Sequence, residues 1–237
     1  MTKTIYFVRH GEMDGTAAGD IDLNVINQYV SGDRDAGLSL TGQSEIKQSA
    51  AWFKEKKIKA AYSSHLARAK ESAQIFSREL NIDHHINDHL AEINVGSIDP
   101  TKNRFFNAVF TGILGAYSAA PAVISRLMFP VITRLLIYSY LFRWLAGKTT
   151  GGESIKDAFG RMNQGLTDII GEHDDDDEVV IVSHGYFITL LAFQCVRRHK
   201  IDLFKLGNFF WVANGSVTMF TVDEQGDVRL RYFARRV

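Results

Sequence analysis

Two short runs of apolar, β-forming residues, far apart in the chain, end in the same pattern, and this pairing constrains the fold more than any other feature. Residues 5–8 lead directly into Arg9-His10-Gly11, and residues 179–182 lead into Ser183-His184-Gly185. Strands that are apolar on both sides are typical of a parallel sheet covered on both faces. Because ligands bind at the carboxyl ends of such strands, we expect His10 and His184 to lie together at one edge of the sheet.

The rest of the chain alternates between helical and strand patterns, which predicts an α/β fold: a mainly parallel sheet in a three-layer sandwich, with a helical apolar insertion. We expect a single domain over residues 1–237, with an apolar, basic insertion at residues 100–150. Residues 12–40 are rich in turn-forming residues and predict a long loop, after which Thr41 is a candidate helix N-cap. The expected helices are 41–56, 66–80, 151–171 and 186–196, and the further strands are 60–63, 217–222 and 228–233.

The residues at the two strand ends suit a phosphate ligand. A histidine at such an edge can face the ligand, and the glycine after it allows close approach of backbone. His184 also precedes the expected helix at 186–196, whose free N–H groups favour an anion. Arg68, soon after the strand at 60–63, adds a guanidinium that can bind an anion through two hydrogen bonds. The sequence therefore predicts a pocket of two imidazoles and two guanidiniums, the latter from Arg9 and Arg68.

Seven motifs occur in the order found in the histidine phosphatase superfamily, also called the phosphoglycerate mutase-like family, and the chain resembles its phosphatase branch. The resemblance covers residues 5–99 and 150–222. Each motif alone is weak, but seven in the right order are a strong signal. They are Arg9-His10-Gly11; Leu38-Ser39 with Gly42; Tyr62-Ser63-Ser64 with Leu66 and Arg68-Ala69; Leu90-Ala91-Glu92 with Gly96; Gly151-Gly152-Glu153-Ser154 with Arg161; Ser183-His184-Gly185; and Asn214-Gly215-Ser216-Val217.

The resemblance implies a histidine acid-base phosphatase, a phosphomonoester hydrolase that acts through a phosphohistidine intermediate. His10 would attack phosphorus, and Glu92 would protonate the leaving oxygen and then activate water. The positive charges of Arg9 and Arg68 are expected to keep His10 neutral and therefore nucleophilic. The implied phosphate-binding residues are Arg9, Arg68, His184, Gly11 and Gly185, and no metal or other cofactor is implied.

Departures from the family pattern leave alternatives open. Met13 and Thr16 stand where the mutases usually carry a small hydroxyl residue and an asparagine that contacts phosphate. Ile98-Asp99-Pro100 stands where phosphatases often carry an aromatic-acidic-glycine triplet, so Asp99 is an alternative acid to Glu92. Hydrolysis is favoured, with a phosphoglycerate mutase-like phosphotransferase and a non-catalytic phosphate-binding scaffold as alternatives. The partner of Arg161 is also open between phosphate, Glu153 and a neighbouring helix.

The remaining histidines and the single cysteine suggest no further chemistry. His84, His85 and His89 could form a metal cluster, but an expected strand there would send neighbouring side chains to opposite faces. Cys195, in an apolar run, is expected to be a small core residue, which fits a reducing compartment. No secretory signal is visible, so we expect a cytoplasmic location. The histidines expected on the solvated surface are His65, His84, His85, His89, His173 and His199.

The formal net charge of zero is the sum of two opposed blocks. Residues 100–152 contain six Lys or Arg and no Asp or Glu, giving +6, while the other residues sum to 21 − 27 = −6. Residues 105–125 carry no charge, but a single membrane crossing there would separate His10 from His184. We expect the insertion to be a cap over the pocket, with a membrane-associating element and an oligomer interface as alternatives.

These features also predict partners. We expect a phosphorylated substrate with an apolar moiety, and no nucleic acid. An anionic membrane surface, at which the protein would be peripheral, and a second copy in a homodimer are the alternative partners of the insertion.

Overall fold

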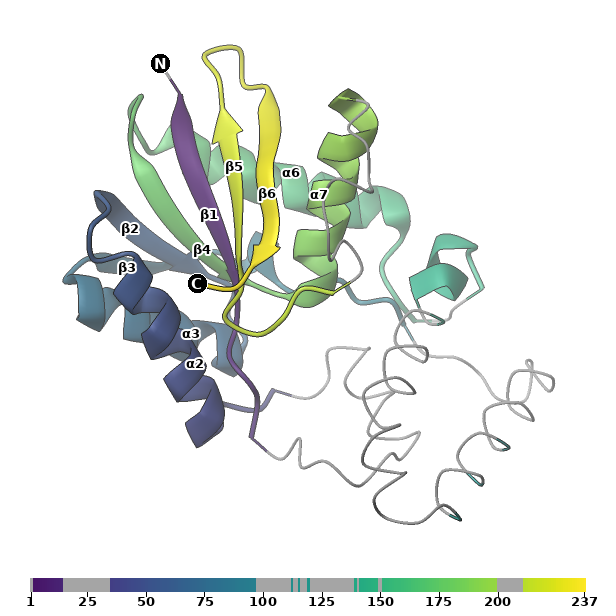
Figure 1. Cartoon of the computed structure of the whole chain (residues 1–237). Helices are drawn as coiled ribbons and strands as arrows, with labels where there is room; N and C mark the ends of the chain where they lie inside the picture. The colour runs from purple at the N-terminus through teal and green to yellow at the C-terminus, as the bar shows by residue number, and fades with distance from the viewer. Residues whose placement is uncertain are drawn as a thin grey trace. The chain divides into compact units, whose positions relative to one another are not determined.

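The computed structural model describes residues 2–14, 35–96, 112, 115, 119, 139, 141–148, 151–199 and 211–237 (Figure 1). The chain divides into two compact units. The first unit comprises Met1–Gly15, Asp35–Glu92 and Phe159–Val237, and the second comprises Thr16–Arg34 and Ile93–Ala158. All of the predicted site residues fall in the first unit.

The first unit is built on a six-stranded sheet in the order β3-β2-β4-β1-β5-β6. The first four strands in this order run parallel to one another, and β5 is antiparallel to both of its neighbours. The mainly parallel sheet predicted from the sequence is therefore confirmed. The strands are β1 (Lys3–Arg9), β2 (Ile58–Ser63), β3 (Asp83–Ile86), β4 (Glu178–Ser183), β5 (Val217–Val222) and β6 (Val228–Arg235).

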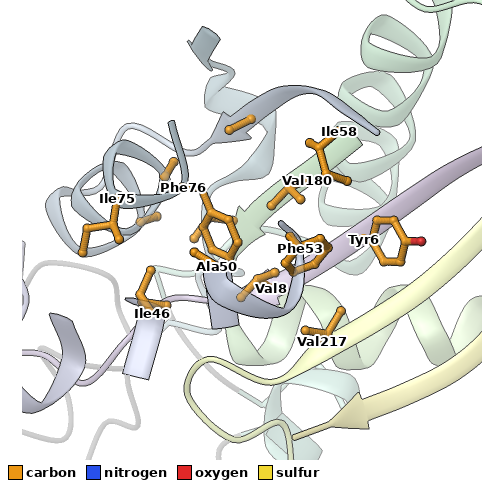
Figure 2. Packing of buried hydrophobic residues seen from close by; sticks show 14 of the residues in the cluster. Tyr6, Val8, Ile46, Ala50, Phe53, Ile58, Ile75, Phe76, Val180 and Val217 are labelled. Atoms are coloured by element: carbon orange, nitrogen blue, oxygen red, sulfur yellow. The ribbon is translucent and has the colours of Figure 1, made fainter. Parts of the chain in front are cut away.

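The central strands β1 and β4 are buried on both faces, as their unbroken apolar runs predict. Tyr6 and Val8 of β1 pack into a cluster with α2 (Leu40–Trp52) and α3 (Ala67–Leu80), which Figure 2 shows around Phe53 and Phe76. Phe7, which points the other way because strand side chains alternate, contacts Phe187 of α7 (Gly185–His199).

The fourth helix, α6 (Ile155–Gly171), completes the second helical layer. Ala61 of β2 belongs to the cluster with α2 and α3, so its neighbour Tyr62 faces the opposite side, where its hydroxyl donates to Glu172 just beyond α6. Figure 1 shows α6 behind the sheet and α2 and α3 in front of it. The predicted three-layer sandwich is confirmed.

The start of α2 differs from the prediction. Ser39, rather than Thr41, is its N-cap, and the Ser39 hydroxyl accepts a hydrogen bond from the amide of Gly42 at 3.0 Å. Ser39 also donates to the carboxylate of Glu12, a tertiary contact that the local sequence does not reveal. The helix ends at Trp52, four residues before the predicted end.

Most of the predicted loop at 12–40 and of the predicted insertion at 100–150 lies outside the described residues. At the edges of the loop, Met13 and Leu38 form an isolated antiparallel bridge and are both buried. In the second unit, residues 141–145 are helical, and the indole of Trp144 donates to the carbonyl of Glu153 at 2.7 Å. Within the described part of the chain, no helix combines the length and apolar character needed to cross a membrane.

Candidate active site

His10 follows β1 directly and is 2% exposed. Its Nδ1 atom lies 2.7 Å from the carbonyl oxygen of Gly11. A carbonyl only accepts hydrogen bonds, so Nδ1 carries the proton, and in the neutral ring the lone pair belongs to Nε2. The local backbone thus leaves Nε2 as the one ring nitrogen of His10 with an available lone pair.

His184 follows β4 in the same way and is fully buried, with its ring centroid 5.1 Å from that of His10. The prediction that the two histidines meet at one sheet edge is confirmed. The Nε2 atom of His184 lies 2.7 Å from the hydroxyl oxygen of Ser64, which follows β2. Its Nδ1 atom is buried without a hydrogen-bond partner among the described residues, so it is the polar group that the ring retains for a ligand.

Both rings are held in the neutral form. Burial, the largest cause, lowers the pKa of His10 well below the ordinary 6.5, and the charges of Arg9 and Arg68 lower it further. Burial likewise lowers the pKa of His184, with Arg68, His10, Arg9 and Arg161 adding to the effect. The predicted influence of the arginines is therefore confirmed, but desolvation outweighs it.

The two predicted guanidiniums lie close enough to act electrostatically on both rings. Arg68 is in the first turn of α3 and only 4% exposed. Arg9 donates from Nη1 to the carbonyl of Val212 at 2.6 Å, and its Cζ atom lies 5.7 Å from the ring centre of Trp211. Two cations, of which Arg68 is buried and Arg9 partly exposed, lie beside two buried neutral imidazoles, and such a cluster favours an anion.

The two glycines that follow the histidines have different surroundings. A Cβ atom on Gly11 would lie 2.4 Å from the carbonyl oxygen of Gly42, so the two backbones can approach only because both residues are glycines. The amide of Gly11 donates to the Ser72 hydroxyl, which donates in turn to the carbonyl of Arg68. At Gly185, a Cβ atom would be 3.6 Å from the Arg9 guanidinium, an ordinary contact.

Glu92 occupies the helix terminus that the sequence assigned to a ligand. Its two carboxylate oxygens accept from the amides of Phe187 at 3.0 Å and Tyr186 at 3.3 Å, in the first turn of α7. Two of the N–H groups at this helix start therefore bind a carboxylate of the chain itself, and binding of phosphate at this terminus stays a prediction. The contact places the predicted acid beside the helix that begins directly after His184.

Of the partners left open for Arg161, its described hydrogen bonds include a neighbouring helix, the short 3-10 helix Asp88–Leu90 that precedes Glu92. Its guanidinium donates to the carbonyl oxygens of His89, Ala91 and Glu92. The alternative acid, Asp99, lies outside the described residues, as does Thr16.

Three of the six predicted surface histidines, His84, His173 and His199, are partly buried and bonded through the ring; in His199, Nε2 lies 3.0 Å from the carbonyl oxygen of Val228. His84 is partly buried and bonded through Nε2 to the Ser63 hydroxyl, and burial lowers its pKa. His173 has a side chain only 13% exposed and bonds through Nε2 to the Tyr62 hydroxyl. Local patterns do not predict these bonds, because each partner lies more than 20 positions away in the chain. Among the described residues, no group of three His, Cys, Asp or Glu side chains could hold a metal ion.

Cys195 is buried, as predicted, and burial raises the pKa of its thiol to about 11. The sequence interpretation gave no supporting role to Ser72 or Trp211, and it named Ser64 only as part of a motif. Ser72 had a local signal, since it follows Arg68 by one helical turn. Ser64 and Trp211 act through contacts across more than 100 positions of the chain, which local patterns do not report.

Comparisons with known proteins agree with this geometry. The family model for the histidine phosphatase superfamily, branch 1, matches residues 5–120 and 137–234. A 2,3-bisphosphoglycerate-dependent phosphoglycerate mutase of Thermoplasma acidophilum is 31% identical over 111 residues, which are 46% of this chain and 52% of that protein. The match therefore spans about half the length of this curated relative.

Solved structures share the fold over nearly the whole chain. "Mycobacterial hydrolase 1" has a TM-score of 0.64 at 19% identity, with all of both chains covered. A mycobacterial glucosyl-3-phosphoglycerate phosphatase has a TM-score of 0.62 at 18% identity, covering 99% of each chain. A phosphoglycerate mutase from Bacillus anthracis has a TM-score of 0.62 at 20% identity, covering 99% of this chain and 94% of the other.

Phosphatases and mutases thus share this architecture, and identities this low speak for the fold alone. The family model, by contrast, matches most of the chain, including the segments that carry both histidines and Glu92. The protein belongs to the histidine phosphatase superfamily, branch 1.

Proposed function

We propose that this protein is a phosphomonoester hydrolase in which His10 forms a phosphohistidine. The observation that carries the proposal is the fixed state of the His10 ring: Nδ1 is held by the Gly11 carbonyl, and burial keeps the ring neutral, so Nε2 is a free nucleophile. The buried charge of Arg68 and the Nδ1 atom of His184, which has no hydrogen-bond partner among the described residues, support binding of the phosphoryl group next to His10.

In the first step, Nε2 of His10 forms a bond to phosphorus as the bond from phosphorus to the leaving oxygen breaks. Arg9, Arg68 and the Nδ1–H of His184 would stabilise the charge on the phosphoryl oxygens. The leaving oxygen takes a proton from Glu92. In the second step, Glu92 accepts a proton from water, the water oxygen bonds to phosphorus, and the bond to His10 breaks.

The position of Glu92 suits both of its proposed states. Two amide donors at a helix N-terminus stabilise the ionised carboxylate, which is the form that activates water. A phosphate ester brings negative charge beside it, which disfavours the ionised form and promotes uptake of the proton that the first step needs.

The test is to trap the intermediate. After rapid quenching with a labelled phosphate ester, we expect label on the wild-type protein that is stable in base and lost in acid, and none on His10→Ala. His85→Ala is the matched control, because His85 is an exposed residue on the edge strand β3 and should retain the label. Full turnover by His10→Ala would reject the proposal, and phosphate binding without any turnover by the wild type would favour the scaffold.

A phosphoglycerate mutase-like phosphotransferase is the second candidate, because the curated relative from Thermoplasma acidophilum is a mutase. Against it, Met13 stands where the family's mutases usually carry a small hydroxyl residue, and Met13 is buried and paired through its backbone with Leu38. Product analysis with phosphoglycerates separates the two: a hydrolase releases inorganic phosphate, whereas a mutase returns an isomeric ester.

For the substrate class, we propose an ester with an apolar moiety, on the strength of the apolar, basic composition of residues 100–150. A panel of sugar, nucleotide, lipid and phosphoprotein esters tests this, and we expect kcat/KM to rise with the apolar area of the leaving group. Sedimentation with and without anionic liposomes tests the membrane alternative, and absence of binding in both would remove it.

A further inference from the structure

Side chains from other parts of the chain hold the backbone of the segment that carries Glu92. Arg161 of α6 donates from Nη1 to the carbonyl oxygens of His89 at 2.8 Å and Ala91 at 2.9 Å, and from Nη2 to that of Glu92 at 3.3 Å. The carbonyl between them, on the buried Leu90, accepts from the Ser183 hydroxyl at 3.0 Å. Four consecutive carbonyls, 89–92, are thus bonded to side chains from outside the segment.

A close approach of α6 makes this arrangement possible. Gly165 lies one turn after Arg161 and so faces the same side of the helix. A Cβ atom at Gly165 would lie 2.8 Å from Cβ of His89, nearer than real Cβ contacts come. Any side chain there would push α6 away from the segment and lengthen the hydrogen bonds of Arg161.

The groups that bond to segment 89–92 also link it to the end of β4, where His184 lies. Ser183 directly precedes His184, and the carboxylate of Glu92 is bonded to the first turn of α7, which begins directly after His184. A guanidinium is well suited to this arrangement, because its donors are spread over several nitrogens in a rigid plane, whereas the three donors of a lysine share one nitrogen on a flexible stem. Arg161 donates a hydrogen bond to the backbone carbonyl of Glu92, and two amides of α7 donate to its carboxylate. Residue Glu92 is therefore held both at its backbone and at the end of its side chain.

We propose that Arg161 is a positioning residue for proton transfer, which holds segment 89–92 so that the Glu92 carboxyl meets the leaving oxygen. The inference rests on the proposed role of Glu92 as the general acid. It concerns the first step only: no bond to Arg161 forms or breaks, and the proton passes from Glu92 to the leaving oxygen as the bond to phosphorus breaks.

The dependence of rate on the leaving group tests this, because a poor leaving group needs a proton and a good one does not. Phenyl phosphate and p-nitrophenyl phosphate are the probes, since phenolate is the more basic leaving group. A well-placed general acid contributes about 100- to 10,000-fold, so Glu92→Gln should lose that much on phenyl phosphate and far less on p-nitrophenyl phosphate. Arg161→Lys should show the same pattern at roughly tenfold, a typical size for one lost positioning interaction.

Gly165→Ala provides a second variant that leaves every charge in place. Its matched control is Gly160→Ala in the same helix, where an added Cβ would have no neighbour within 4 Å. We expect Gly165→Ala to lose activity selectively on phenyl phosphate and Gly160→Ala to match the wild type on both esters. In the double variant Arg161→Lys with Glu92→Gln, no further selective loss should appear, because both changes remove the same proton transfer.

The outcomes are distinguishable. Equal losses on both esters in Arg161→Lys and Gly165→Ala would mean that the contacts serve only folding or phosphate binding, and would overturn the inference while leaving the role of Glu92 intact. If the losses of activity on phenyl phosphate in Arg161→Lys and Glu92→Gln add fully in the double variant, the inference about Arg161 is likewise overturned. If Glu92→Gln itself lacks leaving-group dependence, the general acid is assigned wrongly, and the role of Arg161 falls with it.

Discussion

The two strand ends that carry His10 and His184 have the same sequence pattern but opposite ring environments. The His10 ring is held at Nδ1 by a backbone carbonyl, whereas the His184 ring is held at Nε2 by the hydroxyl of Ser64. The first arrangement leaves Nε2 with a lone pair, and the second leaves Nδ1 for a ligand. The comparison teaches that one neighbouring atom decides which ring nitrogen stays available, so under the proposed mechanism that atom, and not the His-Gly motif itself, separates the nucleophile from the hydrogen-bond donor.

The largest expected effect comes from removing the His184 ring, the hydrogen-bond donor of the proposed mechanism. Under the proposed mechanism, His184→Ala should lower kcat by about 100- to 1000-fold, as removal of one transition-state donor does. The amide of asparagine places an N–H near the position of Nδ1, while that of glutamine places it near Nε2. We therefore expect His184→Asn to recover part of the loss and His184→Gln to recover none. Equal kcat values for these two variants would contradict the assignment of Nδ1.

The glycines offer the next contrast. Gly11→Ala would force a Cβ atom against the Gly42 backbone, and overpacking of this kind costs about 1–3 kcal/mol of unfolding free energy. Gly185→Ala meets only ordinary contacts in the first turn of a helix, so we expect no loss and a gain of up to about 1 kcal/mol. Urea denaturation measures both, and a similar loss in the two variants would show that the glycines serve the same purpose.

The sequence predicted what depends on long apolar runs and did not predict what depends on distant partners. Residues 5–8 and 179–182 identified the central strands because burial on both faces requires unbroken apolar side chains. The cap of α2 was placed two residues too late, and the bond from Ser39 to Glu12, 27 positions away, is a contact that a local pattern does not report. Glu92 was recognised as a candidate acid, but nothing near it in the chain predicts its bonds to amides more than 90 positions away.

The two buried rings also make a shared prediction about pH. Unfolded histidine titrates near pH 6.5, while the pKa of each ring is lowered in the folded protein. Between the two values the unfolded state binds more protons, so the unfolding free energy falls as pH falls below about 6.5, by about 1.4 kcal/mol per pH unit for each ring.

Urea denaturation at a series of pH values measures this slope. The slope depends on the number of protons that the unfolded state binds in excess of the folded state. His10→Gln should therefore remove the contribution of one ring to the slope, and the double variant His10→Gln with His184→Asn should remove both contributions. This holds whatever the absolute stabilities of the variants are. A wild-type unfolding free energy that stays level across the pH unit below 6.5 would contradict burial of both rings in the neutral form.

The smallest expected effect concerns the Ser64 hydroxyl, whose bond to Nε2 makes the ring environment of His184 differ from that of His10. Because the His184 ring is neutral, it has one N–H, and Nδ1 can donate to a phosphoryl oxygen only while Nε2 accepts from the Ser64 hydroxyl. Ser64→Ala removes that donor and allows the proton to move to Nε2, which should lower kcat about fivefold, the worth of one hydrogen bond of ~1 kcal/mol. Ser64→Thr retains a hydroxyl and should restore most of the activity. In the His184→Asn background the amide has no tautomer to choose, so Ser64→Ala should cost nothing further there; an undiminished loss in that background would assign Ser64 a role in packing instead.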